Sequence, residues 1–124
     1  MNFDMEKYFK LIILFLIISF STSCSGQDCN TIDNNFSSYQ SALKIIKSSK
    51  FKTSDNCDTS ESSWIYSAKY FSCDEKTGFL LIETKSKTYI HKEVPIEKWS
   101  EFKKAQSFGK YYNQNIKSRF QLIL

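Results

Sequence analysis

The chain has 124 residues and a formal net charge of +4; 16% of its residues are aromatic, and it contains only three Gly and one Pro. This composition excludes a disordered tail or a low-complexity linker, because both are poor in aromatic residues. The length excludes two domains with separate cores, so we expect one small folded domain after a leader segment at the N-terminus.

The first 23 residues have the order of charge, apolar run and small residues that is typical of a secretory signal peptide. Lys7 and Lys10 precede a largely apolar stretch, 11–20, which is followed by small residues at 21–23. A helix of about ten residues spans roughly 15 Å, half of a ~30 Å hydrocarbon core, so the stretch is too short for a transmembrane helix. We therefore predict that residues 1–23 are a signal peptide.

Cys24 follows the small residues directly, and the arrangement resembles a bacterial lipobox, in which the cysteine receives a lipid and becomes the first residue. Ser23 suits the position before the cut, whereas Ser21 stands where the usual residue is Leu. The resemblance implies an envelope lipoprotein, held by acyl chains such as palmitate that contribute about 0.8 kcal/mol per buried CH₂. Two alternatives remain, ordinary secretion with a cut after Ser23 and an uncleaved signal anchor. Some bacterial lipoproteins carry an acidic surface-export tag after the lipidated cysteine, whereas only Asp28 is acidic near the new N-terminus here. We therefore expect the lipid-anchored protein to face the periplasm.

If Cys24 is acylated, three cysteines remain, and the compartment beyond the inner membrane is oxidising. We expect Cys29 to pair with Cys57, because Cys29 lies just before a predicted helix and Cys57 lies in the loop that follows it. Cys73 lies at a strand end, where we interpret it as a small buried thiol. The chain has no Cys-x-x-Cys and a single His, so we assign no metal and no cofactor.

Residues 33–48 are predicted to form an amphipathic helix, because their apolar side chains recur at steps of three and four. Asp33 or Asn34 can cap the N-terminus of this helix. Residues 49–62 are polar and aperiodic and are expected to be a loop. Residues 24–61 are therefore expected to be a lipidated tether, a helix and a loop that precede the main domain, which we place at 62–121.

Three strands are expected next, because aromatic and branched residues alternate there with polar ones. They are residues 63–71, 79–84 and 88–92. The first two are joined by a turn at 74–78, in which Gly78 can adopt positive φ, and the last two by a tight turn at 85–86. This order predicts an antiparallel meander.

Two helices are expected after the strands. The first begins at Pro95 and is expected to end at Gly109 in a left-handed C-cap. The second has apolar side chains at steps of four, namely Tyr112, Ile116 and Phe120. Strands followed by helices predict an α+β fold, with an N-terminal helix, a three-stranded antiparallel meander and then two helices packed on one face, and all helices on that same face of the sheet.

Three groups of residues in the second half of the chain occur together and in order. They are Val94-Pro95, Ala105-x-Ser107-x-Gly109 and Tyr112-Asn113-x-x-Ile116. With weaker elements upstream, these groups resemble the KTSC domain over residues 62–121. The resemblance implies a domain that occurs at the C-terminus of some lysyl-tRNA synthetases and alone in bacteria, and for which RNA binding has been suggested. The family's central Tyr-x-Tyr is Tyr89-x-His91 in this sequence.

The candidate binding residues lie in two places. Tyr89 and His91 are two apart on a predicted strand and so share a face, where they could stack on a ligand or could simply pack under a helix. Ser107 and Asn113 flank a turn into a helix, where exposed N–H groups could hold a phosphate or where both residues could act as caps. With a basic neighbour of His91 included, the ligand-binding candidates are Tyr89, His91, Lys92, Ser107 and Asn113.

The charges are unevenly distributed along the mature chain. Residues 24–84 carry six Lys against eight acidic residues, whereas residues 85–124 carry nine basic residues against three Glu. The basic half is either a solvated surface or the site of an anionic partner, and beyond the cytoplasm we expect lipid headgroups, glycans or DNA rather than tRNA. The sequence thus predicts a membrane-anchored, non-enzymatic binding domain whose ligand and protein partner it does not identify. The alternative is an envelope hydrolase that uses His91 as a base.

Overall fold

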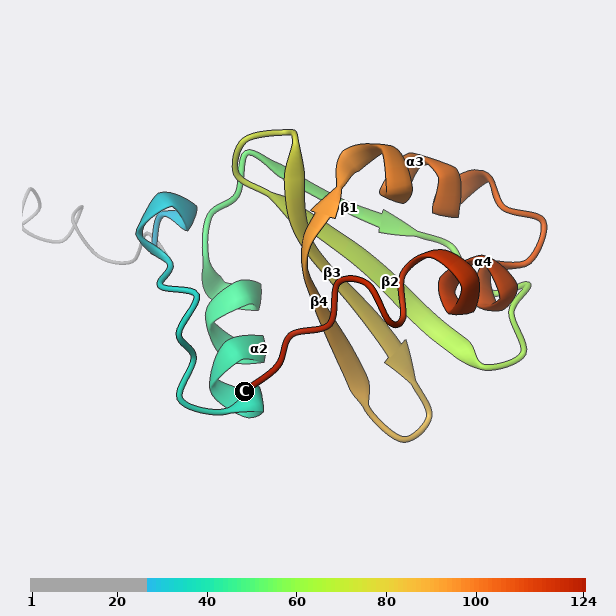
Figure 1. Cartoon of the computed structure of the whole chain (residues 1–124), viewed down its shortest axis with the longest axis horizontal. Helices are drawn as coiled ribbons and strands as arrows, with labels where there is room; N and C mark the ends of the chain where they lie inside the picture. Colours follow the sequence, from blue (N-terminus) through green and yellow to red (C-terminus); the bar gives the residue numbers. More distant parts are fainter. Residues whose placement is uncertain (1–26) are drawn as a thin grey trace, which may run out of the picture.

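The computed structural model describes residues 27–124, which form a four-stranded antiparallel sheet packed between helices (Figure 1). The elements in chain order are η2 (Cys29–Thr31), α2 (Tyr39–Ser48), β1 (Thr53–Cys57), β2 (Ile65–Ser72), β3 (Thr77–Thr84), β4 (Thr88–Pro95), α3 (Ile96–Lys104) and α4 (Phe108–Asn115). The strands lie in the sheet in chain order. The predicted α+β class and the antiparallel meander are therefore confirmed, with four strands instead of three. The predicted signal peptide, residues 1–23, and Cys24 lie outside the described residues.

The additional strand, β1, lies in the segment 49–62 that the sequence predicts to be a loop. It pairs with β2 alone, so it is an edge strand, and its residues before Cys57 are polar. An edge strand forms ladder hydrogen bonds on one side only and lacks the apolar alternation by which inner strands are detected. Asp55 instead attaches β1 to α3, because its Oδ2 accepts hydrogen bonds from Lys103 Nζ (2.8 Å) and Trp99 Nε1 (2.9 Å). These two bonds hold the pKa of Asp55 below its ordinary value.

The sheet is packed on both faces. In β3 the consecutive residues Leu80, Leu81 and Ile82 are all buried, which happens only when a strand is covered on both sides. Leu80 and Ile82 belong to the cluster under α3 and α4, whereas Leu81 belongs to the cluster under α2. The prediction that the helices lie on one face therefore holds for α3 and α4 and is wrong for α2, which lies on the opposite face (Figure 1).

Three helix ends differ from the predicted ones: α2 begins later, α3 ends at Lys104 rather than at Gly109, and the last helix ends before Phe120. α2 begins after Ser38, whose Oγ accepts from the Ser41 N–H (3.1 Å), whereas the Asp33 carboxylate accepts from the Asn35 N–H (3.0 Å) in a separate turn. The last helix ends at Asn115. Among residues 27–124, no helix is long and apolar enough to cross a membrane.

The C-terminal segment continues beyond α4 along the outer edge of β4. The Lys92 N–H donates to the Phe120 carbonyl (2.8 Å), and the Leu122 N–H donates to the Ile90 carbonyl (3.2 Å). The buried Leu122 side chain joins the cluster under α2, and Figure 1 shows the C-terminus beside that helix. The segment thereby covers backbone groups of β4 that an uncovered edge would expose.

The two described glycines, Gly78 and Gly109, have negative φ, so the predicted left-handed conformations are wrong at both positions. The turn before β3 uses Glu75 instead, with φ of 60°. Close packing explains both glycines. A Cβ at Gly78 would lie 2.3 Å from the Phe71 carbonyl oxygen, and a Cβ at Gly109 would lie 2.3 Å from Nε1 of the Trp64 indole.

We expect Gly78→Ala to lower the free energy of unfolding by about 1–3 kcal/mol, because the new methyl group meets backbone of the neighbouring strand. Gly109→Ala is the matched comparison, since its methyl meets a side chain and alanine gains roughly 1 kcal/mol of helix propensity. Urea denaturation of both variants measures the difference. An effect of Gly109→Ala as large as that of Gly78→Ala would contradict this explanation.

Candidate functional site

His91 is buried in the core between the sheet and α4. Its side chain is 2% exposed, and its Nε2 lies 2.9 Å from the Tyr112 hydroxyl, which is also buried. Burial lowers the pKa of His91 to about 4, so the imidazole is neutral at pH 7. Nδ1 is buried and has no hydrogen-bond partner within residues 27–124. The structure therefore places His91 among packed residues rather than at the surface.

Tyr89 is half-buried and packs against the cluster under α3 and α4, which contains Tyr112. The Lys87 ammonium lies 4.7 Å from the centre of the Tyr89 ring and 5.2 Å from that of Tyr39 on α2. Stacking under a cation and packing on the core are structural roles for an aromatic residue. Of the two interpretations of Tyr89 and His91, stacking on a ligand or packing under a helix, the structure shows the packing.

Ser107 is the N-cap of α4, and its Oγ accepts from the Lys110 N–H (3.2 Å). It lines a polar pocket of about 200 Å³ together with Ser63, Trp64 and Gly109. Asn113 is exposed on α4 and does not line this pocket. Lys92 lines a different pocket, so the structure does not bring the five predicted residues together in one site.

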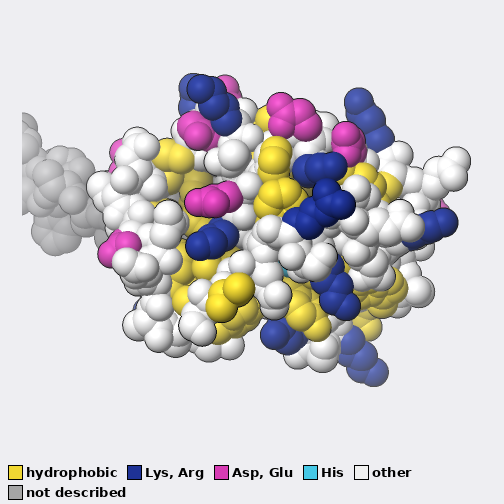
Figure 2. All heavy atoms as spheres, in the orientation of Figure 1, with side chains coloured by type: hydrophobic (Ala, Val, Ile, Leu, Met, Phe, Trp, Pro, Cys, Tyr) yellow, Lys and Arg dark blue, Asp and Glu magenta, His cyan; other side chains and the backbone are white. Residues whose placement is uncertain are grey.

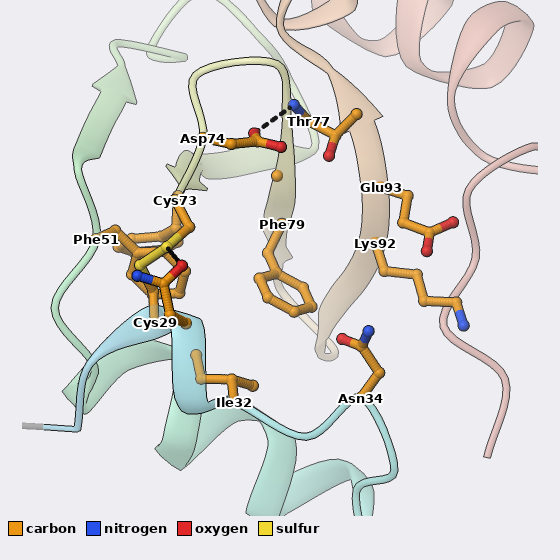
Figure 3. A pocket seen from close by; sticks show the side chains of 13 residues that line it. Cys29, Ile32, Asn34, Phe51, Cys73, Asp74, Thr77, Phe79, Lys92 and Glu93 are labelled. Atoms are coloured by element: carbon orange, nitrogen blue, oxygen red, sulfur yellow. Dashed lines mark hydrogen bonds between the residues drawn. A yellow bond between two sulfur atoms is a disulfide. The ribbon is translucent and has the colours of Figure 1, made fainter.

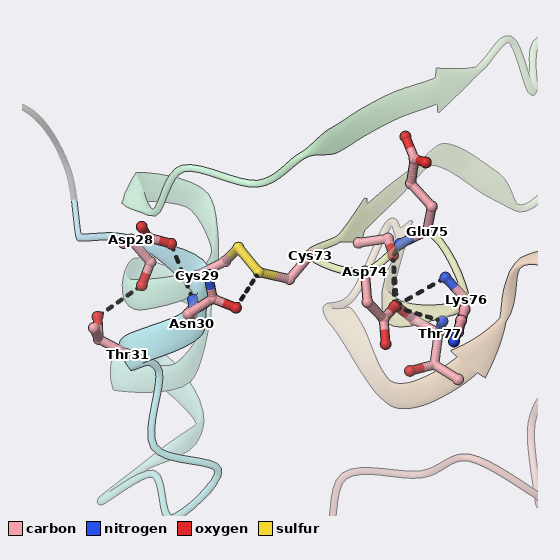
Figure 4. The surroundings of a disulfide bond; sticks show 10 residues. Asp28, Cys29, Asn30, Thr31, Cys73, Asp74, Glu75, Lys76 and Thr77 are labelled. Atoms are coloured by element: carbon pink, nitrogen blue, oxygen red, sulfur yellow. Dashed lines mark hydrogen bonds between the residues drawn. A yellow bond between two sulfur atoms is a disulfide. The ribbon is translucent and has the colours of Figure 1, made fainter.

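The disulfide joins Cys29 of η2 to Cys73 at the end of β2, with a Cα–Cα distance of 5.8 Å (Figure 4). The predicted pair of Cys29 and Cys57 is therefore wrong, and so is the interpretation of Cys73 as a lone thiol. Cys57 is free and half-buried on the α3 and α4 face of the sheet, where burial raises the pKa of its thiol. Cys29 lines a pocket together with aromatic rings of the cluster under α2. It therefore lies on the opposite face of the sheet from Cys57.

This pocket, of about 330 Å³, lies beside the disulfide on the α2 face of the sheet and is the candidate functional site (Figure 3). Its apolar floor consists of aromatic rings: Phe51 packs on Phe71 (ring centres 5.3 Å apart) and on Phe79 (6.2 Å). Figure 3 shows Phe79 extending from β3 toward the segment that carries Ile32 and Asn34. Polar side chains form the rim, namely Asn30, Asn34, Asp74, Thr77, Lys92 and Glu93.

A β-bulge in β4 determines which charges reach this rim. Gly78 pairs with Val94 and Leu80 pairs with His91, so two residues, Lys92 and Glu93, lie opposite the single residue between them on β3. Glu93 has φ of 56°, a left-handed conformation that a glycine normally supplies. Sequence reasoning missed Glu93 because 88–95 contains no glycine to indicate the bulge.

One carboxylate of the rim, that of Asp74, is already engaged in the turn before β3. Asp74 Oδ1 accepts from the N–H groups of Lys76 (2.9 Å) and Thr77 (3.0 Å), which lowers the pKa of this carboxyl (Figure 4). In contrast, neither Lys92 nor Glu93 takes part in a salt bridge in the part of the chain that the structure describes. These two side chains are therefore free to interact with a ligand.

The basic second half of the chain is only partly neutralised within the domain. Lys103 is paired with Asp55 (2.8 Å) and Lys98 with Glu101 (3.7 Å). Figure 2 shows Lys and Arg spread over the face in view, together with acidic side chains in its upper and left part and without them at its lower right. The predicted anionic partner remains a prediction.

Comparison with known proteins identifies the domain. The family model of the KTSC domain matches residues 61–120, which run from just before β2 to the segment beside β4. The match includes β2 to β4, α3 and α4, and it leaves out α2, β1 and Cys29. Searches of curated proteins and of solved structures found no match to the chain. The resemblance predicted from the sequence is confirmed: residues 61–120 match the KTSC domain.

Proposed function

We propose that this protein is an exported bacterial envelope lipoprotein, in which a KTSC domain acts as a non-enzymatic binding module held at a membrane by acyl chains on Cys24. The observation that supports this most is the Cys29–Cys73 disulfide. Disulfides form and persist in oxidising compartments and are rare in the bacterial cytosol. An oxidised pair in the folded domain fits the signal-peptide pattern of residues 1–23, which is an independent feature of the sequence.

The position of the disulfide also fits an anchor at Cys24. Five residue steps separate Cys24 from Cys29, so an extended chain spans at most roughly 18 Å between the lipid and the first covalent attachment to the sheet. A domain on so short a tether stays close to the headgroups. Unpaired basic side chains of the second half would then gain roughly 1 kcal/mol each near an anionic surface.

The surroundings of His91 argue against the hydrolytic alternative. A general base has to reach the proton that it abstracts, within hydrogen-bond distance or through one water. The His91 side chain is 2% exposed, its Nε2 is engaged with Tyr112, and its pKa is about 4. The alternative of an envelope hydrolase with His91 as base therefore lacks the accessible imidazole that it requires.

Metabolic labelling with a fatty acid tests the anchor. We expect the wild-type protein to incorporate the label and Cys24→Ser to lose it, because the lipid is attached through the sulfur of Cys24. Cys57→Ser is the matched control and should be labelled like the wild type. Equal labelling of Cys24→Ser and the wild type, or no label in either, would refute the lipid anchor.

A further inference from the structure

The pocket beside the disulfide combines an aromatic floor with charges of both signs at one side of its rim. The rings of Phe51, Phe71 and Phe79 form the floor, and the disulfide keeps the η2 segment in place as one wall. Ligand sites in proteins are typically such concave apolar surfaces with a few polar groups, and their volume starts near 300 Å³. The pocket, at about 330 Å³, has the size for a small molecule.

The bulge in β4 brings a basic and an acidic side chain to the same face of the sheet. Side chains in a regular strand alternate, so Lys92 and Glu93 would point to opposite faces. His91 and Val94 both pack on the α3 and α4 side although they are three residues apart, and both residues between them line the pocket on the α2 side. Figure 3 shows Lys92 and Glu93 extending side by side from β4.

The backbone conformation of Glu93 points to a role for this arrangement. A non-glycine residue with positive φ is strained, and such residues concentrate at functional sites. A glycine at this position would relieve the strain but would remove the carboxylate from the rim. The chain retains a charged side chain there that forms no salt bridge within residues 27–124.

We propose that this pocket binds a free α-amino acid with an apolar side chain. Lys92 pairs with the carboxylate of the ligand, Glu93 pairs with its ammonium group, and the apolar side chain rests on the phenyl rings of the floor. The rim carries one Lys against Glu93 and Asp74, so it disfavours an anion that has no ammonium group. The exposed amides of Asn30 and Asn34 can donate further hydrogen bonds to the carboxylate.

This inference rests on the proposed binding role, and it is independent of the anchor. Failure of fatty-acid labelling would remove the anchor and leave the pocket unaffected. Failure of the binding experiment described next would remove the amino-acid ligand and leave the lipoprotein assignment unaffected.

Isothermal titration of the protein, purified in detergent from cells that express the full chain, tests the ligand. We expect saturable binding of L-phenylalanine and L-leucine. Phenylacetate and phenethylamine, which each lack one of the two charges, should bind at least roughly ten-fold more weakly, because each leaves one side chain at the rim unpaired. No saturable binding of either amino acid up to about 10 mM, or equal binding of the two single-charge analogues, would overturn the proposal.

Variants at the rim test the residues. Lys92→Gln and Glu93→Gln should each weaken L-phenylalanine binding by roughly ten-fold or more, as expected for the loss of a charge-assisted hydrogen bond. Glu93→Gly keeps the bulge and removes the carboxylate, so it should lose affinity to the same degree while remaining folded by thermal melting. Lys104→Gln, at an exposed lysine of α3 outside the pocket, is the control and should bind normally. Unchanged affinity in the Lys92 and Glu93 variants would overturn the proposal.

Discussion

Replacing both Cys29 and Cys73 with Ser is expected to lower the free energy of unfolding by about 4 kcal/mol. The two cysteines are 44 residues apart, and the disulfide restricts the unfolded chain over that whole loop. Stabilities of small domains are about 5–15 kcal/mol, so this loss is a large fraction of the total. With a urea dependence of about 1.5 kcal/mol per M, the midpoint of unfolding should fall by roughly 2–3 M.

Cys57→Ser is the matched control for this experiment, because Cys57 is free. Its midpoint should lie close to that of the wild type, and dithiothreitol should shift the midpoint of both by about as much as the double replacement does. The segment around η2 should be affected first, since the backbone hydrogen bonds that join it to the rest are those between Cys29 and Lys50 (3.0 Å) and between Lys50 and Gln27 (2.8 Å). An unchanged midpoint in the double variant would mean that the disulfide does not stabilise the domain.

Acidification is expected to destabilise the protein through His91 by about 3 kcal/mol between pH 6.5 and pH 4. The pKa of His91 is about 4 in the folded state and near 6.5 in the unfolded chain. Above pH 6.5 the imidazole is neutral in both states and adds no pH dependence. Below it the unfolded chain binds a proton that the folded protein does not, so the free energy of unfolding falls until both states are protonated below pH 4.

Two variants separate this effect from the titration of carboxylates. His91→Phe should abolish most of the decrease between pH 6.5 and 4, whereas Tyr112→Phe removes the hydrogen-bond partner and should keep the decrease. Asp55 and Asp74 have lowered pKa values, so their contributions are lost mainly at lower pH. Urea denaturation at each pH measures the decrease. If the decrease in His91→Phe equals that in the wild type, His91 is not the group responsible.

The parts of the fold that the sequence predicts are those in which one periodicity dominates. β2 has an alternating pattern and lies near the predicted strand, and α3 has a helical pattern and begins next to the predicted Pro95, although it ends at Lys104. β1 could not be detected, because an edge strand anchored through Asp55 needs no apolar pattern. α2 was predicted on the wrong face of the sheet. The periodicity of its sequence shows that one side of the helix is buried, but it does not show against which face of the sheet that side packs. The run from Leu80 to Ile82 was the available signal for a sheet covered on both faces.

The candidate site was harder to predict because it depends on contacts between distant residues. The odd number of cysteines in the mature chain left the partner of Cys29 open, and only the sheet register shows that Cys57 faces away from it. Lys92 was among the predicted residues, but Glu93 was not. A bulge without glycine leaves no local signature, and alternation alone would place Glu93 on the opposite face.

Intact-mass spectrometry of the protein purified from its own envelope, after alkylation of free thiols, tests the account most directly. We expect a chain that begins at Cys24, carries the added mass of a diacylglyceryl group and incorporates one alkyl group, on Cys57. The disulfide between Cys29 and Cys73 should then add two further alkylation sites after reduction. A chain that retains residues 1–23 without lipid, with Cys29 and Cys73 alkylated before reduction, would contradict the proposal of an exported, lipid-anchored KTSC domain.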